Sequence, residues 1–142
     1  MYKILILSMI AVACTITLCA QKLKETQIPS AIRYAFKKKY PNTPARWEKE
    51  NNNFEANFKK DGKIMSALIN KAGTILETET DIAVDELPKA AQSYLKVHYK
   101  VAKIKEAAKI VKAKGEVNYE GEVNGKDVIF DTNGKFIKEA KD

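Results

Sequence analysis

The chain is poor in the residues that most often carry catalysis or bind metals. Its 142 residues include two cysteines, Cys14 and Cys19, and one histidine, His98. Both cysteines lie within the first 20 residues, a stretch that has the features of a removable leader. Without that stretch the chain has no thiol, which excludes a disulfide, a thiolate nucleophile and a cysteine-based zinc site. Such a domain must be stabilised by its hydrophobic core.

Arginine is also scarce. Arg33 and Arg46 are the only arginines among 25 basic residues, and the formal net charge is +7. Nucleic-acid-binding proteins often cluster arginine beside aromatic residues, whereas here lysine is interspersed with acidic residues along the whole chain. Interspersed lysine and acid is typical of a solvated surface, so we expect no nucleic-acid partner.

The first 20 residues have the organisation of an export signal. Lys3 supplies a short positive start, an apolar run extends from residue 4 to residue 18, and Ala20 precedes a polar stretch. The run is shorter than the roughly 20 residues that cross a bilayer. We therefore expect residues 1–20 to be a signal peptide and the protein to be periplasmic or secreted. The alternatives are an uncleaved anchor or a lipidated cysteine, and in both the leader is the expected membrane contact.

The rest of the chain contains the same pattern twice. Residues 28–40 and residues 87–99 each begin with an apolar residue followed by proline, and each ends in tyrosine. In both stretches the apolar residues recur at i, i+4, i+7, i+8 and i+12, which predicts a three-turn helix with one apolar face. Proline is tolerated at the first position of a helix. Repetition of this kind predicts a duplicated architecture.

After each predicted helix the apolar residues alternate with polar ones, as they do in a strand with one buried face. Phe54, Ala56 and Phe58 follow this pattern in the first half, and Val117 and Tyr119 follow it in the second. Four turn signals separate the strands: Asp61-Gly62, Asn70 to Gly73, Asn124-Gly125 and Asn133-Gly134.

These patterns predict an α+β fold, a tandem repeat of two helix-plus-antiparallel-sheet (αβββ) units after an N-terminal signal helix. The domain is expected at residues 21–142, with repeat one at about 24–80 and repeat two at about 83–140. The acidic segment from Glu79 to Glu86 is expected to be a solvated connector between the units. Each helix is expected to cover one face of an antiparallel sheet.

The sequence resembles the PepSY-like, β-lactamase-inhibitor-like (BLIP-like) family of exported bacterial proteins. The shared features are the two apolar-proline helix starts, the segments 36–41, 47–50 and 54–58, and the Gly-Lys hairpins. They extend over almost all of the chain after the leader and are structural rather than catalytic positions. The second half departs from the pattern, since Lys100 replaces a proline and no tryptophan corresponds to Trp47. The resemblance implies a protein that binds other proteins on the open face of its sheet.

No arrangement of residues in the sequence indicates a catalytic or metal site. His98 has no cysteine to act with, and Ser30, Ser66 and Ser93 lack the sequence context of a catalytic serine. The Asp and Asn residues at the turns do not have the spacing of a calcium-binding loop. We therefore expect no enzymatic activity, no cofactor and no metal.

Four residues are candidates for partner binding: Trp47, Glu55, Asn57 and Tyr119. Trp47 and Tyr119 are large aromatic residues, for which we favour a place in the core, under the first helix in the case of Trp47. If they are instead exposed on the sheet, they are candidates to anchor an interface. Glu55 and Asn57 lie on the polar side of a predicted strand, where a charged face can accept a complementary partner.

The function that these observations predict is an exported, non-enzymatic binding module, inhibitor-like, that engages another envelope or extracellular protein with the open face of its sheet. Two alternatives stay open. One is an envelope binder of small molecules or lipids that uses a cavity between helix and sheet, and the other is a weak hydrolase. A large apolar cavity favours the first alternative, whereas a filled core counts against it.

Overall fold

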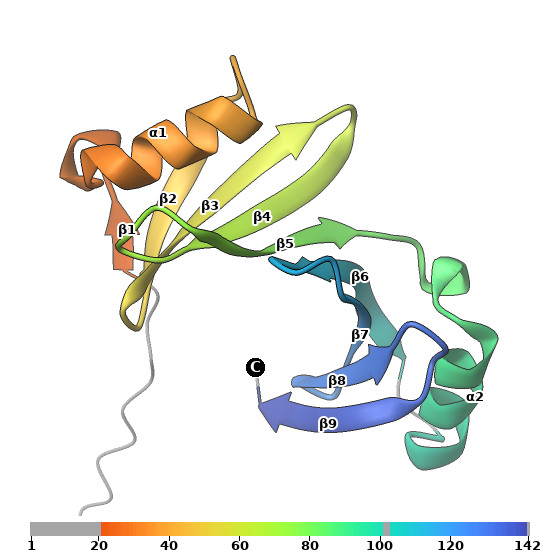
Figure 1. The fold of residues 1–142 in the computed structure, drawn as a ribbon. Coiled ribbons are helices and arrows are strands. Elements are labelled where there is room, and N and C mark those ends of the chain that lie inside the picture. Colours follow the sequence, from red (N-terminus) through yellow and green to blue (C-terminus); the bar gives the residue numbers. More distant parts are fainter. Residues whose placement is uncertain (1–20, 101–102, 142) are drawn as a thin grey trace, which may run out of the picture.

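The structure is a computed structural model that describes residues 21–100 and 103–141. These residues form nine strands, two α-helices and two short 3-10 helices (Figure 1). The helices are η1 (Glu25–Gln27), α1 (Ser30–Lys39), η2 (Val84–Glu86) and α2 (Lys89–His98). The strands are β1 (Gln21–Leu23), β2 (Ala45–Glu50), β3 (Asn53–Lys60), β4 (Lys63–Ile69), β5 (Ile75–Asp81), β6 (Ile104–Lys112), β7 (Val117–Val123), β8 (Lys126–Asp131) and β9 (Phe136–Lys141).

All nine strands of the described chain belong to one antiparallel sheet, and their order across the sheet is their order in the sequence. Every neighbouring pair from β1·β2 to β8·β9 is antiparallel. The sheet curls, with α1 and α2 on its outer side (Figure 1). Its inner side carries neither α-helix.

The predicted tandem of two helix-plus-sheet units is wrong. β5 pairs with β6 from Glu77 opposite Lys112 to Asp81 opposite Ala108, so one ladder of strands runs from the first half of the chain into the second. The expected connector begins inside β5, because threonine alternates with acidic residues from residue 77 to residue 81 and threonine favours strands. The predicted signal helix and the leader at residues 1–20 lie outside the described residues, and the domain limits stay a prediction.

The helix positions predicted by the apolar spacing are confirmed, and each helix buries its apolar face on the outer side of the sheet. Under α1, Ile32 and Phe36 pack in a buried cluster with Phe58 and other residues of β2 to β4. Under α2, Leu95 packs in a second cluster with Phe130 and other residues of β6 to β8. Burying a large apolar side chain stabilises the fold by about 1.5–3 kcal/mol, so these clusters hold the helices to the sheet.

Two glycine turns set the position of the helix starts. Gly73 and Gly134 both have φ +81°, which favours glycine. A Cβ atom on Gly134 would lie 2.8 Å from the backbone nitrogen of Ala91 in α2, and one on Gly73 would lie 3.0 Å from the carbonyl oxygen of Ala31 in α1. The turns therefore pack directly against the first turn of each helix, where a side chain does not fit.

Within residues 21–100 and 103–141, none of the helices has the length and apolarity needed to span a membrane.

Candidate functional site

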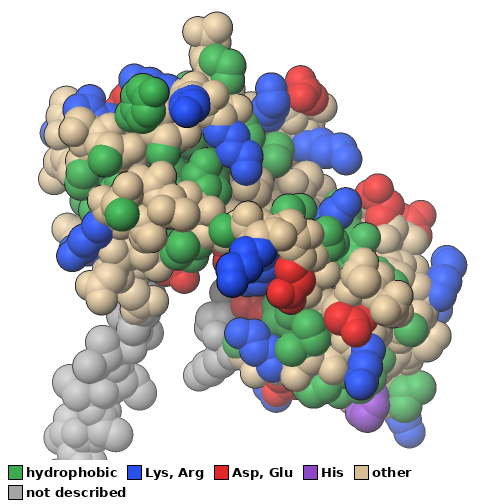
Figure 2. All heavy atoms as spheres, in the orientation of Figure 1, with side chains coloured by type: hydrophobic (Ala, Val, Ile, Leu, Met, Phe, Trp, Pro, Cys, Tyr) green, Lys and Arg blue, Asp and Glu red, His purple; other side chains and the backbone are tan. Residues whose placement is uncertain are grey.

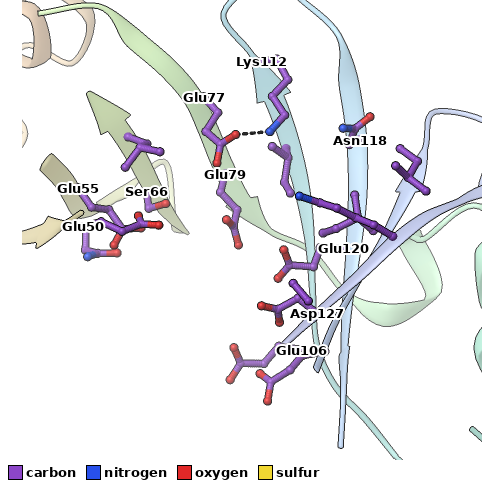
Figure 3. Close-up of a pocket in the computed structure, with 18 of the residues that line it drawn as sticks. Glu50, Glu55, Ser66, Glu77, Glu79, Glu106, Lys112, Asn118, Glu120 and Asp127 are labelled. Carbon is purple, nitrogen blue, oxygen red and sulfur yellow. Dashed lines mark hydrogen bonds and ion pairs between the residues drawn. The ribbon is translucent and has the colours of Figure 1, made fainter. Parts of the chain in front are cut away.

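A large open cavity lies on the inner side of the sheet and encloses about 970 Å³. We call it the acidic trough, because residues of β2, β3, β5, β6, β7 and β8 contribute eight carboxylates to its lining. These are Glu50, Glu55, Glu77, Glu79, Glu106, Glu120, Glu122 and Asp127. Several of them point into the same space from different strands (Figure 3). The alternation of strand residues places most of them on this face, whereas at Glu106 the register of β6 shifts and its neighbour Lys105 lines the trough as well.

Glu79 lies near the middle of the trough. It is part of a row of cross-strand neighbours that crosses the sheet from β3 to β7, in which each residue is opposite the next: Asn57, Ser66, Glu79, Ile110 and Asn118. Its strand, β5, is the central one of the nine. The curl of the sheet therefore brings carboxylates from both halves of the chain around this side chain.

The surroundings of Glu79 in the trough disfavour the ionised form of its carboxyl group. Burial raises the pKa of Glu79 to about 7, helped by the charges of Glu55, Asp81, Glu77 and Asp127. Asp127 belongs to β8, so the repulsion acts across the trough as well as along the sheet. A carboxyl group with such a pKa is only partly ionised at neutral pH.

Glu50, on β2, is affected in the same way. Burial raises the pKa of this carboxyl group, and the charges of Glu55 and Glu77 add to the effect. Repulsion between acids therefore affects Glu50 on β2 as well as Glu79 on β5.

Three lysines line the trough, and two of them are bound to its acids. The ammonium of Lys112 donates a hydrogen bond to Glu77, as drawn in Figure 3. Lys105 Nζ lies 3.0 Å from Glu122 Oε1, and Glu122 is largely buried. The third is Lys138. Eight carboxylates and three lysines leave a balance of −5 when all groups are ionised.

Apolar side chains lie between the charged ones. Ile110 and Ile129 are almost fully buried, whereas Ile137 is 46% exposed. Leu68, opposite Glu77 in the next strand, is half-buried. The floor of the trough is therefore partly apolar, and acidic side chains surround these apolar residues.

The structure separates the four candidate residues of the sequence analysis. Glu55 and Asn57 line the trough. Trp47 is buried under α1, where its ring meets that of Phe36 edge-on at 5.3 Å between centroids. Tyr119 lies on the outer side and packs against the cluster under α2. The two aromatic residues thus lie on the opposite face of the sheet from Glu55 and Asn57.

Sequence reasoning missed Glu79 as a residue of this face. It assigned Glu79 to the solvated connector expected from Glu79 to Glu86, because a run of acidic residues usually lies in a solvated segment. The signal was present in the alternation of acid and threonine from residue 77 to residue 81, which has the period of a strand.

The polar residues considered for catalysis are dispersed. His98 is exposed at the end of α2, where its ring stacks on Tyr94 at 4.0 Å between centroids. Ser30 belongs to α1 and Ser93 to α2, whereas Ser66 lines the trough. In the part of the chain that the structure describes, no group of three or more His, Cys, Asp or Glu side chains is arranged to hold a metal ion.

Solved structures of three proteins share the fold. A DUF2874 family protein from Bacteroides uniformis has a TM-score of 0.70 at 19% identity, covering 80% of this chain and 89% of its own. A protein from Bacteroides eggerthii described as a periplasmic protein has a TM-score of 0.70 at 16% identity, covering 80% and 88%. A BLIP-like protein from Bacteroides fragilis has a TM-score of 0.64 at 23% identity, covering 80% and 85%. At these identities the likeness shows the fold.

The sequence itself matches a family model. That model, described as "Putative beta-lactamase-inhibitor-like, PepSY-like", matches two overlapping parts of the chain, residues 16–75 and 66–138. No curated protein matches the sequence. The two matched parts together span most of the chain, which confirms the resemblance found in the sequence: the protein belongs to the β-lactamase-inhibitor-like, PepSY-like family.

Proposed function

We propose that the protein is an exported, non-enzymatic module that binds another envelope or extracellular protein in the acidic trough. The observation that carries this proposal is the inner face of the sheet, which bears neither α1 nor α2 and is hollowed into a cavity of about 970 Å³. An open face of that size on a rigid hydrogen-bonded sheet presents a preorganised surface, which lowers the entropic cost of binding.

Export is supported by two observations. The sequence begins with the features of a signal peptide. A protein of the same fold from Bacteroides eggerthii is described as periplasmic. We therefore propose that binding occurs in the periplasm or outside the cell.

A binding role accounts for the trough better than hydrolysis does. A hydrolase that uses a serine nucleophile requires a base, usually histidine, within hydrogen-bond reach of that serine. His98 belongs to α2, on the outer side of the sheet, whereas Ser66 lies on the inner side. A turnover that is measured for the protein and lost on His98→Ala or Glu79→Gln would contradict the proposal.

The alternative of a lipid or small-molecule binder needs an apolar cavity between helix and sheet. That space is occupied by side chains that are almost fully buried, among them Ile32 and Phe36 under α1 and Leu95 and Phe130 under α2. The open cavity lies on the opposite face and is lined mainly by polar and charged side chains. A protein surface is the better complement to such a lining.

Site-specific crosslinking in the host cell tests the proposal. A photoreactive amino acid is placed at Ser66, in the trough, and in a second variant at Tyr34, which is 68% exposed on α1. We expect irradiation to attach a second protein to the Ser66 variant and not to the Tyr34 variant. Attachment at Tyr34 alone, or at neither position, would contradict a binding role for the inner face.

A further inference from the structure

We propose that the protein segment that occupies the acidic trough is positively charged, with lysine or arginine side chains lying along the trough floor. The inference rests on the proposed function, because it assigns the chemistry of the partner at the same surface. It makes a narrower claim, which can fail while the binding role of the inner face stands.

The charge of the trough lining is opposite in sign to that of the whole chain. The chain as a whole carries a formal net charge of +7, whereas the trough lining has a balance of −5. On the face shown in Figure 2, lysine and arginine side chains are distributed over the described surface with acidic residues among them. Eight of the 18 acidic residues of the chain line the trough, against three of its 25 lysines and arginines. Complementary charge steers a cationic segment into the trough and disfavours an acidic one.

The trough already accepts cationic side chains of the protein itself. Lys112 extends to Glu77 on the neighbouring strand, and Lys105 extends to Glu122. Both are lysine side chains of the protein itself, held by carboxylates on the inner face. They show that an ammonium group fits among these acids with a direct hydrogen bond.

Acidic side chains of the trough also repel one another. Burial and the charge of Glu55 both raise the pKa of Glu79 and of Glu50. Repulsion of this kind persists in the free protein, and a cation placed between the carboxylates relieves it. Binding of a positive segment therefore gains free energy from interactions that are unfavourable before the segment arrives.

The apolar part of the trough floor also suits such a segment. Leu68 is half-buried and Ile137 is 46% exposed, and both line the trough together with the acidic side chains. Lysine and arginine have apolar stems and charged ends, so the stems can cover these residues while the ends reach the carboxylates. A metal ion satisfies only the acids and leaves this floor exposed.

The test uses the exported protein and a short fluorescein-labelled peptide of alternating lysine and alanine, with a glutamate-alanine peptide as the comparison. Binding is measured by fluorescence anisotropy at pH 8 and low ionic strength. We expect the lysine peptide to bind, the glutamate peptide not to bind, and added salt to weaken binding.

Two double variants locate the binding. Glu55→Gln with Glu79→Gln removes two carboxylates from the trough, and Asp61→Asn with Asp85→Asn removes two from exposed positions elsewhere. Both change the net charge by the same amount. We expect the trough variant to weaken binding by about tenfold and the matched control by less than about twofold.

Three results would overturn the inference. Equal weakening by the two variants would mean that overall charge, not the trough, holds the peptide. Equal or tighter binding of the glutamate peptide would reverse the assigned sign. A thermal midpoint that rises with calcium ions but not with the lysine peptide would identify a metal ion as the occupant. If the Ser66 crosslink still forms in any of these cases, only the charge assignment fails.

Discussion

The phenolic oxygen of Tyr40 lies 3.2 Å from Oγ1 of Thr78, which links the end of α1 to the central strand β5. Both residues are buried, so water does not replace this hydrogen bond if it is lost. Thr78 points to the outer side of the sheet and its neighbour Glu79 lines the inner side. The strand that anchors α1 is therefore the strand that carries the centre of the trough.

We expect Tyr40→Phe to lower the free energy of unfolding by about 1 kcal/mol, because it leaves the Thr78 hydroxyl group without this bond. Urea unfolding of the variant measures the loss. The matched control is the double variant Tyr40→Phe with Thr78→Val, which removes both partners. Its loss is expected to be smaller than the sum of the two single losses, and strict additivity would contradict the coupling.

Glu79 is expected to destabilise the protein at high pH. Its pKa in the folded state is about 7, above the usual value of 4.5, so the folded state holds this proton more tightly than the unfolded chain does. The contribution is most favourable below pH 4.5 and is lost as the pH rises through 7. The difference corresponds to at most about 3 kcal/mol.

Replacing this group tests the sign. Glu79→Gln keeps the shape of the protonated side chain and cannot ionise, so we expect the variant to be more stable than the parent at pH 8 and similar to it at pH 4. Urea unfolding at both pH values measures the difference. Asp85→Asn, at an exposed position, is the control and should change stability little at either pH. A destabilised Glu79→Gln protein at pH 8 would contradict the assignment.

Peptide binding in the trough is expected to depend on pH for the same reason. The charges that face Glu79 are those of Glu55 on β3, Glu77 and Asp81 on β5, and Asp127 on β8. Ionisation of Glu79 above pH 7 adds a negative charge beside them, so the lysine-alanine peptide should bind several-fold more tightly at pH 8 than at pH 6. Anisotropy titrations at both values check this, and Glu79→Gln should reduce the difference.

Gly134 should tolerate alanine poorly. Its φ of +81° disfavours a side chain, and a Cβ atom there would also lie 2.8 Å from the backbone nitrogen of Ala91. Gly115 has a similar φ of +85°, but nothing lies within 4 Å of a Cβ atom at that position. Gly134→Ala should therefore lower the free energy of unfolding by about 1–3 kcal/mol more than Gly115→Ala does. If urea unfolding gives equal losses of stability for the two variants, α2 moves away from the new Cβ atom without a loss of free energy.

Much of the local structure could be predicted from the sequence. The spacing of apolar residues identified both helices, since a helix places residues three and four apart on one face. Asp61-Gly62 and Asn124-Gly125 marked the turns between β3 and β4 and between β7 and β8, where Asp61 and Asn124 have positive φ. These signals depend only on residues close together in the chain.

The acidic trough could be predicted only in small part. Glu55 and Asn57 were recognised as residues of a polar strand face, but Glu79 was assigned to a connector. In the sequence, β5 and β6 are separated by a connection that contains all of α2. No local pattern therefore predicts that these two strands pair. The assignment of two separate units failed at this pairing.

The sequence by itself determined where helices and turns form and which residues of each strand share a face, because these properties follow from the geometry of the backbone over a few residues. Only the tertiary structure decided that the strands join into one curled sheet, that Trp47 lies under α1, and that acids from β2 to β8 face a common cavity. The physical reason is that these features depend on pairings between residues far apart in the chain. The free energy of such a pairing depends on both segments together, so neither segment predicts it alone.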